Sequence, residues 1–116
     1  MTSATRHFAF AEVVLVPFPF TDQSGIKKRP AVIVSSRAYN VNRRDIVIMA
    51  ITSQVRTPLS FGEAMVTDWQ AAGLLKPSLL KPVFTSIEQG LVIGSMGALS
   101  ADDQAMLRGL LAQILA

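Results

Sequence analysis

The sequence has no cysteine and a single histidine, His7, among its 116 residues. Without cysteine the chain forms no disulfide, offers no thiol nucleophile and cannot build a zinc site from thiolates. A single histidine also excludes catalysis by a histidine pair and most metal sites built from imidazoles. The sequence contains no phosphate-binding loop and no carboxylate spacing typical of metal sites. We therefore expect a protein from a reducing compartment that uses no metal and no cofactor.

Long apolar runs are equally scarce. The longest, residues 13–20, contains two prolines and falls far short of the roughly 18–20 residues that a membrane helix needs. The N-terminal segment MTSATRHFAFAE has no apolar core long enough for a signal peptide. We therefore expect no membrane association and a cytoplasmic location. The length predicts a single domain over residues 1–116.

Charge is modest, whereas apolar content is high. A net charge of +3 helps to attract a polyanion but is too common to assign a nucleic-acid ligand by itself. Hydrophobic residues make up 50% of the chain, which is a large share for a small domain, because small folds expose proportionally more of their surface. We expect part of that apolar surface to contact another subunit.

Short β-branched and aromatic runs, separated by turn signals, predict a mainly β domain. The clearest strand candidates are residues 12–20, 30–36 and 45–52, and the weaker ones are residues 63–67, 79–86 and 91–93. The polar or turn-rich segments 21–28, 53–60 and 71–78 read as loops, and 37–44 as a connection. The run 45–52 is apolar on both faces, which predicts a central strand beside 30–36.

The C-terminal segment predicts a helix. Ser100 suits the N-cap position, and Asp102 and Asp103 suit the positive helix start. Apolar residues then recur at helical spacing and predict one stripe that packs on the core. The members of this stripe are Met106, Leu107, Leu110, Leu111, Ile114 and Leu115.

A basic run, Lys27, Lys28 and Arg29, precedes Pro30. Such a run is most often a solvated turn. Proline, however, disfavours helical backbone for the residue before it, so Arg29 is held extended at the mouth of a strand. Its planar guanidinium donates two parallel hydrogen bonds to a phosphate or carboxylate and stays charged at physiological pH. Arg29 therefore suits stabilisation of an anion and does not suit the role of a base.

A polar cluster, Thr52, Ser53 and Gln54, ends the predicted central strand. The simplest interpretation is a strand terminus whose hydroxyls cap the next turn. If strands 30–36 and 45–52 lie side by side, these hydroxyls and the Arg29 guanidinium share one phosphate-sized site. Both interpretations remain open on the residues alone.

Three segments in this order, VVLVPFPFTDQSGIKKRPAVIVS, DIVIMAITSQ and AAGLLKPS, resemble the motif blocks of the MazF/PemK toxin family. The resemblance covers nearly the whole chain, and the first block is the most specific. It implies a Src-homology-3-like small β-barrel of the MazF/PemK/CcdB type, with helical decorations and a C-terminal α-helix. It also implies a homodimeric toxin of a type II toxin–antitoxin system that cleaves single-stranded RNA, often messenger RNA, at specific sequences and is held silent by a cognate antitoxin.

The same resemblance implies roles for individual residues. Arg29 and Thr52 become the catalytic pair, with Ser53 in support. The flanking segments supply RNA contacts, namely Thr21, Gln23, Lys27, Lys28 and Gln54.

The chain departs from the family at Ala11 and Glu12, where the family usually has Gly-Asp. An acidic residue is kept, as Glu in place of Asp, but the loss of glycine affects how the first strand begins.

In metal-free cleavage, the 2′-hydroxyl of the RNA attacks the adjacent phosphorus and leaves a 2′,3′-cyclic phosphate and a 5′-hydroxyl. The general base stays open among Glu12, Asp22 and solvent, since neither Arg29 nor Thr52 accepts a proton easily near neutral pH. Two other functions also stay open: a CcdB-like poison of DNA gyrase that cleaves no RNA, and an RNA-binding member without catalysis.

Overall fold

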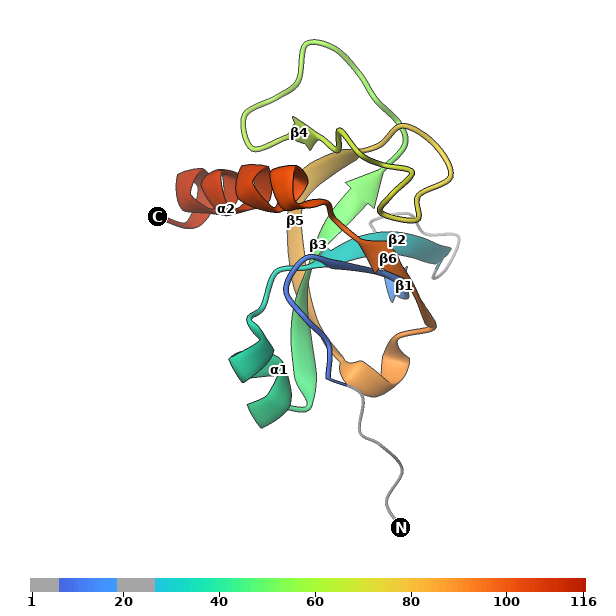
Figure 1. Ribbon diagram of the computed structural model, residues 1–116, viewed down its shortest axis with the longest axis vertical. Helices are drawn as coiled ribbons and strands as arrows, with labels where there is room; N and C mark the ends of the chain where they lie inside the picture. The colour runs from blue at the N-terminus through green and yellow to red at the C-terminus, as the bar shows by residue number, and fades with distance from the viewer. Residues whose placement is uncertain (1–6, 19–26) are drawn as a thin grey trace.

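A computed structural model describes residues 7–18 and 27–116, and its ribbon shows a curled sheet with one long helix (Figure 1). Six antiparallel strands follow the order β4-β5-β3-β2-β1-β6, with β4 and β6 at the edges. The strands are β1 (Glu12–Phe18), β2 (Lys27–Ile33), β3 (Asp45–Thr52), β4 (Ala64–Met65), β5 (Leu79–Glu88) and β6 (Gly94–Ala98). The helical elements are α1 (Arg37–Asn42), the 3₁₀ turn η1 (Gln89–Leu91) and α2 (Ala101–Leu115). The predicted mainly β fold with a C-terminal helix is confirmed.

Strand β3 has the bounds predicted from sequence and lies between β5 and β2 at the centre of the sheet. Its buried apolar residues alternate between two apolar clusters, as the period of a strand requires. Ile46 and Ile48 pack with Phe8 and Val16 on one face. Met49 and Ile51 pack on the other face, in the cluster that includes residues of α2. The sheet therefore has a core on both faces, and α2 closes one of them.

Helix α2 begins as predicted, because the hydroxyl oxygen of Ser100 accepts a hydrogen bond from the Asp103 N–H at 3.2 Å. Leu107 and Leu110 are buried in the core. The predicted stripe is wrong at its end, since Leu115, in the last turn of the helix, is 63% exposed. No helix in residues 7–18 and 27–116 has both the length and the apolar character needed to span a membrane.

Asp103 is almost fully buried, and its carboxylate reaches a different segment of the chain. One oxygen accepts a hydrogen bond from the Thr67 N–H at 3.0 Å, and the other accepts one from the Asp68 N–H at 2.8 Å. These two N–H groups belong to the turn that follows β4. Asp103 therefore fastens the start of α2 to that turn.

Several predicted boundaries are wrong. Strand β2 starts at Lys27 and ends at Ile33, instead of spanning residues 30–36, because its basic residues pair with β1. The supposed connection 37–44 contains α1, which Ser36 caps by accepting a hydrogen bond from the Tyr39 N–H at 3.1 Å. The predicted strand 91–93 is replaced by η1 and then β6, which uses Gly94 and Gly97 where no side chain has to pack.

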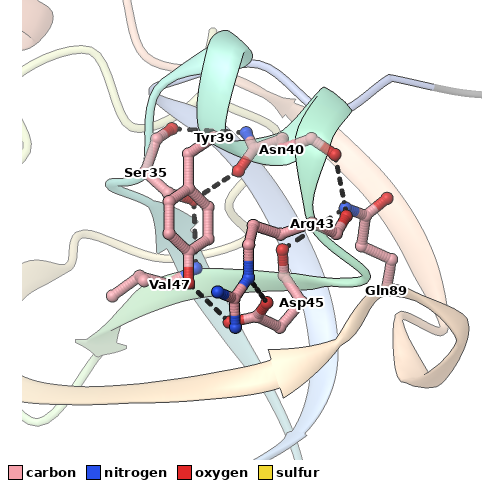
Figure 2. Close-up of polar contacts among 7 residues, drawn as sticks. All are labelled: Ser35, Tyr39, Asn40, Arg43, Asp45, Val47 and Gln89. Carbon is pink, nitrogen blue, oxygen red and sulfur yellow. Dashed lines mark hydrogen bonds and ion pairs between the residues drawn. The ribbon is translucent and has the colours of Figure 1, made fainter.

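A buried amide holds α1 against the sheet (Figure 2). The side-chain amide of Asn40 donates to the Phe8 carbonyl at 2.9 Å, and its oxygen accepts from the Ser35 hydroxyl. The same hydroxyl oxygen accepts from the Val47 N–H of β3 at 3.0 Å. Gln89 donates from η1 to the Asn40 carbonyl at 2.7 Å. These hydrogen bonds compensate for the removal of the Asn40 amide from water.

A partly buried cluster at the same place adds a second connection (Figure 2). Asp45, the first residue of β3, accepts hydrogen bonds from the Tyr39 hydroxyl at 2.7 Å and from the Arg43 Nε at 3.1 Å. The hydrogen bond from Tyr39, with a smaller effect from Arg43, lowers the pKa of Asp45. The same hydrogen bond raises the pKa of Tyr39. The ionised carboxylate thus stabilises the end of α1.

Two glycines allow the segment before β5 to lie directly on β6. Gly73 has a φ of +82°, and a Cβ placed on it would lie 1.9 Å from the Met96 carbonyl oxygen. A Cβ on Gly97 would lie 2.7 Å from the Ala72 carbonyl oxygen. Both distances are too short for any side chain. The close approach fixes residues 71–78 beside the end of the sheet where β3 finishes.

Candidate functional site

The two predicted catalytic residues lie on neighbouring strands. Strands β2 and β3 are antiparallel, with Ala31 opposite Ala50, so the same register continued by two residues places Arg29 opposite Thr52. Both residues are half-buried. The extended backbone expected before Pro30 is present, since Arg29 lies within β2.

Arg29, Thr52 and Ser53 line one pocket of 260 Å³. The segment 71–78 supplies the opposite wall, with Lys76 and Ser78 as polar members. The remaining lining is apolar and comes from Leu15, Pro30, Ile51, Leu74, Leu75 and Met96. The structure thus brings together the predicted guanidinium and the predicted hydroxyls, and adds a second cation.

Sequence reasoning missed Lys76 as a site residue. The signal was present, because AAGLLKPS is one of the three motif blocks, but its position beside Arg29 depends on the contact between Gly73 and Met96. Leu75, one of the apolar residues that line this pocket, is 88% exposed.

The hydroxyl of Thr52 has a defined orientation. Its oxygen accepts a hydrogen bond from the Gln54 N–H at 3.1 Å, so the hydroxyl hydrogen is available to another acceptor. A guanidinium and a donating hydroxyl that line one pocket are hydrogen-bond donors of the kind that bind phosphate groups in proteins. Chemically, the pocket can hold an anion and stabilise additional negative charge on it.

A second cavity of 320 Å³ shares Thr52 with the first. Its other lining residues come from the loop after β3 and from the start of β5, and they are mainly polar. They are Gln54, Arg56, Pro58, Ser60, Glu63, Leu79 and Lys81. The predicted RNA contact Gln54 therefore belongs to this cavity and is not among the residues that line the Arg29 pocket.

The other predicted residues lie elsewhere. Lys27 and Lys28 are exposed on β2 opposite Phe18 and Pro17. They do not line the Arg29 pocket. Thr21, Asp22 and Gln23 fall outside the described residues. Among residues 7–18 and 27–116, no three histidine or acidic side chains are grouped so that they could hold a metal ion.

Glu12 does not line the Arg29 pocket. Its carboxylate accepts hydrogen bonds from the Ala9 N–H at 3.2 Å and from the Ser95 hydroxyl at 2.9 Å. It also lies four residues along β1 from Val16, the partner of Arg29, which is about 13 Å of strand. The structure therefore does not bring Glu12 together with Arg29 and Thr52.

The departure at Ala11 has a structural explanation. Ala11 has a φ of +71°, a conformation that glycine adopts without strain and alanine adopts at a cost of about 1 kcal/mol. Its methyl group is fully buried in the core, which contributes roughly 0.8 kcal/mol. Burial of the methyl group therefore offsets much of the cost of beginning β1 with an alanine in this conformation.

Several solved structures share this fold, although the sequence matches no curated protein significantly. One is an endoribonuclease in complex with its cognate antitoxin from Mycobacterial species, 14% identical, with a TM-score of 0.72 and coverage of 96% of this chain and 95% of that one. Another is a MazE–MazF structure from Deinococcus radiodurans, 24% identical, with a TM-score of 0.70 and coverage of 95% and 97%.

A family model described as the PemK-like, MazF-like toxin of type II toxin–antitoxin systems matches residues 9–115. The match spans every strand and helix of the described structure. The chain therefore belongs to the PemK-like, MazF-like toxin family of type II toxin–antitoxin systems.

Proposed function

We propose that this toxin is a metal-independent, sequence-specific endoribonuclease that cleaves single-stranded RNA at the Arg29 pocket. The observation that carries the proposal is the meeting of Arg29, Thr52 and Ser53 on one pocket at the ends of two paired strands. The name of one solved neighbour supports it, since the protein from Mycobacterial species is described as an endoribonuclease.

In the proposed reaction, the 2′-hydroxyl oxygen forms a bond to phosphorus while the bond from phosphorus to the 5′-oxygen breaks. The attacking hydroxyl loses a proton and the leaving oxygen gains one, which yields a 2′,3′-cyclic phosphate and a 5′-hydroxyl. Arg29 donates to the non-bridging oxygens, where negative charge accumulates. Thr52 donates its hydroxyl hydrogen to the same phosphate and holds it in position.

The proton acceptor is not a carboxylate of the described pocket wall. None of the residues that line the Arg29 pocket within 7–18 and 27–116 is acidic, and Glu12 is held by Ala9 and Ser95. Asp22, which lies outside the described residues, and solvent remain as acceptors. Lys76, on the opposite wall, adds a second positive charge for the RNA backbone.

The proposal includes two protein partners and a cytoplasmic location. An antitoxin is one expected partner, because a solved neighbour is described as an endoribonuclease in complex with its cognate antitoxin. A second copy of the chain is the other. Phe61, 79% exposed, and Leu75, 88% exposed, are large apolar side chains that such partners could cover.

The decisive experiment compares Arg29→Ala with wild type on a long RNA of known sequence in EDTA. We expect wild type to leave 5′-hydroxyl ends at defined sites. We expect Arg29→Ala to lower the cleavage rate roughly 10²–10³-fold, as the loss of one charge-stabilising donor does. Arg29→Lys keeps the charge without the planar fork and should lie in between.

Arg44→Ala is the matched control, because Arg44 is exposed and lines neither cavity beside Thr52. Folding of every variant is checked by urea unfolding. Full cleavage by folded Arg29→Ala, or cleavage that requires a metal, contradicts the proposal. Intact RNA together with inhibited DNA supercoiling identifies a gyrase poison instead.

A further inference from the structure

The polar cavity beside Thr52 has no part in the proposed chemical step. It is the larger of the two cavities that share Thr52, at 320 Å³ against 260 Å³. Because Thr52 lines both cavities, an RNA whose scissile phosphate contacts Thr52 can place a neighbouring nucleotide in this cavity. What this cavity recognises in a substrate therefore rests on the proposed RNA cleavage.

Glu63 presents a fixed carboxylate to the cavity. One of its oxygens accepts a hydrogen bond from the Ser60 N–H at 2.8 Å, while its own N–H donates to the Ser60 carbonyl at 3.0 Å. This reciprocal pair holds a half-buried side chain just before β4. A carboxylate has about four acceptor positions, so most of its capacity remains available to a ligand.

The cavity combines this acid with two exposed cations. Arg56 and Lys81 line the same space, and neither forms an ion pair within the part of the chain that the structure describes. The Glu63 carboxylate accepts hydrogen bonds and the two cations donate them, so the set suits a neutral group that has adjacent N–H donors and separate acceptors.

Of the four RNA bases, guanine has this pattern. Its N1–H and N2–H₂ are adjacent donors, and its O6 and N7 are adjacent acceptors. Adenine and cytosine place a ring-nitrogen acceptor beside their amino group, and uracil flanks its single N–H with two carbonyl oxygens. Each of these three would direct at least one acceptor toward the Glu63 carboxylate, and such an unmatched polar contact is costly in a partly buried site.

We propose that the cavity beside Thr52 binds a guanine base next to the scissile phosphate. Glu63 accepts hydrogen bonds from N1–H and N2–H₂, while Arg56 and Lys81 donate toward O6 and N7. Gln54 lies at the same cavity and can contact either edge. Glu63 is therefore the residue that selects the base, whereas Arg29 and Thr52 act on the phosphate.

The test maps all 5′-hydroxyl ends that wild type and Glu63→Gln produce from one long RNA. Glutamine still accepts the Ser60 N–H, so the local turn is retained, but it replaces one acceptor by a donor. We expect guanine at one fixed position beside the wild-type cuts, and a roughly tenfold to hundredfold loss of that preference in Glu63→Gln, as for one bidentate base contact. Glu88→Gln, at the exposed end of β5, makes the same change elsewhere and should keep the wild-type preference.

An unchanged preference in Glu63→Gln, or no guanine beside the wild-type cuts, overturns the inference while leaving RNA cleavage intact. Absence of any cleavage by wild type refutes the proposed function instead. The cavity is then tested directly by titrating ¹⁵N-labelled protein with guanosine and adenosine 5′-monophosphates. We expect the amide signals of Gln54, Ser60 and Glu63 to shift at lower concentrations of the guanosine nucleotide in wild type, and equally for both nucleotides in Glu63→Gln. Equal response of wild type to both nucleotides overturns the inference.

Discussion

Replacement of Asp103 by alanine should destabilise the fold far more than the same change one residue earlier. The Asp103 carboxylate is 1% exposed and accepts the N–H groups of Thr67 and Asp68 at 3.0 and 2.8 Å. Asp102 also lies in the first turn of α2 but is exposed. Both acids interact favourably with the start of the helix, so the difference between the two variants reports the connection to the turn after β4.

The size of the effect follows from the two hydrogen bonds. A hydrogen bond to a charged group contributes roughly 1.5–3 kcal/mol. Because Thr67 and Asp68 are exposed residues, water can replace part of what is lost, so we take the lower end for each. Asp103→Ala should therefore lower the free energy of unfolding by about 3 kcal/mol, a large share of the roughly 5–15 kcal/mol of a typical domain. Asp102→Ala should cost about 0.3–1 kcal/mol.

Urea unfolding at one protein concentration measures both variants, since any self-association would make stability depend on concentration. A third variant, Asp103→Asn, keeps one carbonyl oxygen and should lose about half as much as Asp103→Ala. In a thermal scan the alanine variant should melt about 12 °C lower, at roughly 4 °C per kcal/mol for this size. Equal losses in Asp103→Ala and Asp102→Ala would refute the reasoning.

Two further predictions concern the backbone and pH. Gly73→Ala should lower the free energy of unfolding by at least about 3 kcal/mol, since its Cβ would meet a carbonyl oxygen at 1.9 Å. Gly109→Ala, with open space in α2, should raise it by up to about 1 kcal/mol. Urea unfolding compares the two variants. The folded pKa of Asp45 is lowered, first by the Tyr39 hydroxyl, so its stabilising effect is present above the unfolded pKa near 3.8 and lost as pH falls through the folded value. Asp45→Asn should weaken the dependence of unfolding free energy on pH below 5, and an unchanged dependence would contradict this.

Local patterns predicted the parts of the fold that depend on local chemistry. The bounds of β3 followed from its uninterrupted apolar run, and the start of α2 followed from Ser100. The start of β2 was missed because Lys27 and Lys28 resemble a loop in composition. They belong to a strand because β1 supplies the pairing partner, which no local signal contains. Helix α1 is too short for a periodic pattern, and only Ser36 marked its beginning.

The site residues also divide into those that local patterns predict and those that distant contacts position. The proximity of Arg29 and Thr52 was predictable. In two adjacent antiparallel strands the start of one lies beside the end of the other, and Arg29 is near the start of β2 whereas Thr52 ends β3. Lys76 and Glu63 were not predicted as site residues, because both stand on irregular segments positioned by distant contacts. Glu12 was a reasonable candidate by residue type, yet its place on β1 separates it from the pocket.

The close approach between residues 72–73 and 96–97 also restricts how this sequence can diverge. Each glycine faces the main chain of the other segment, so no second substitution can make room by shrinking a neighbouring side chain. At most packed positions, a second mutation can compensate for a larger side chain. No such compensation is possible at Gly73 and Gly97. Descendants of this chain that keep the wall of the Arg29 pocket should retain both glycines, whereas those that lose either one should have rebuilt the segment 71–78 by insertion or deletion.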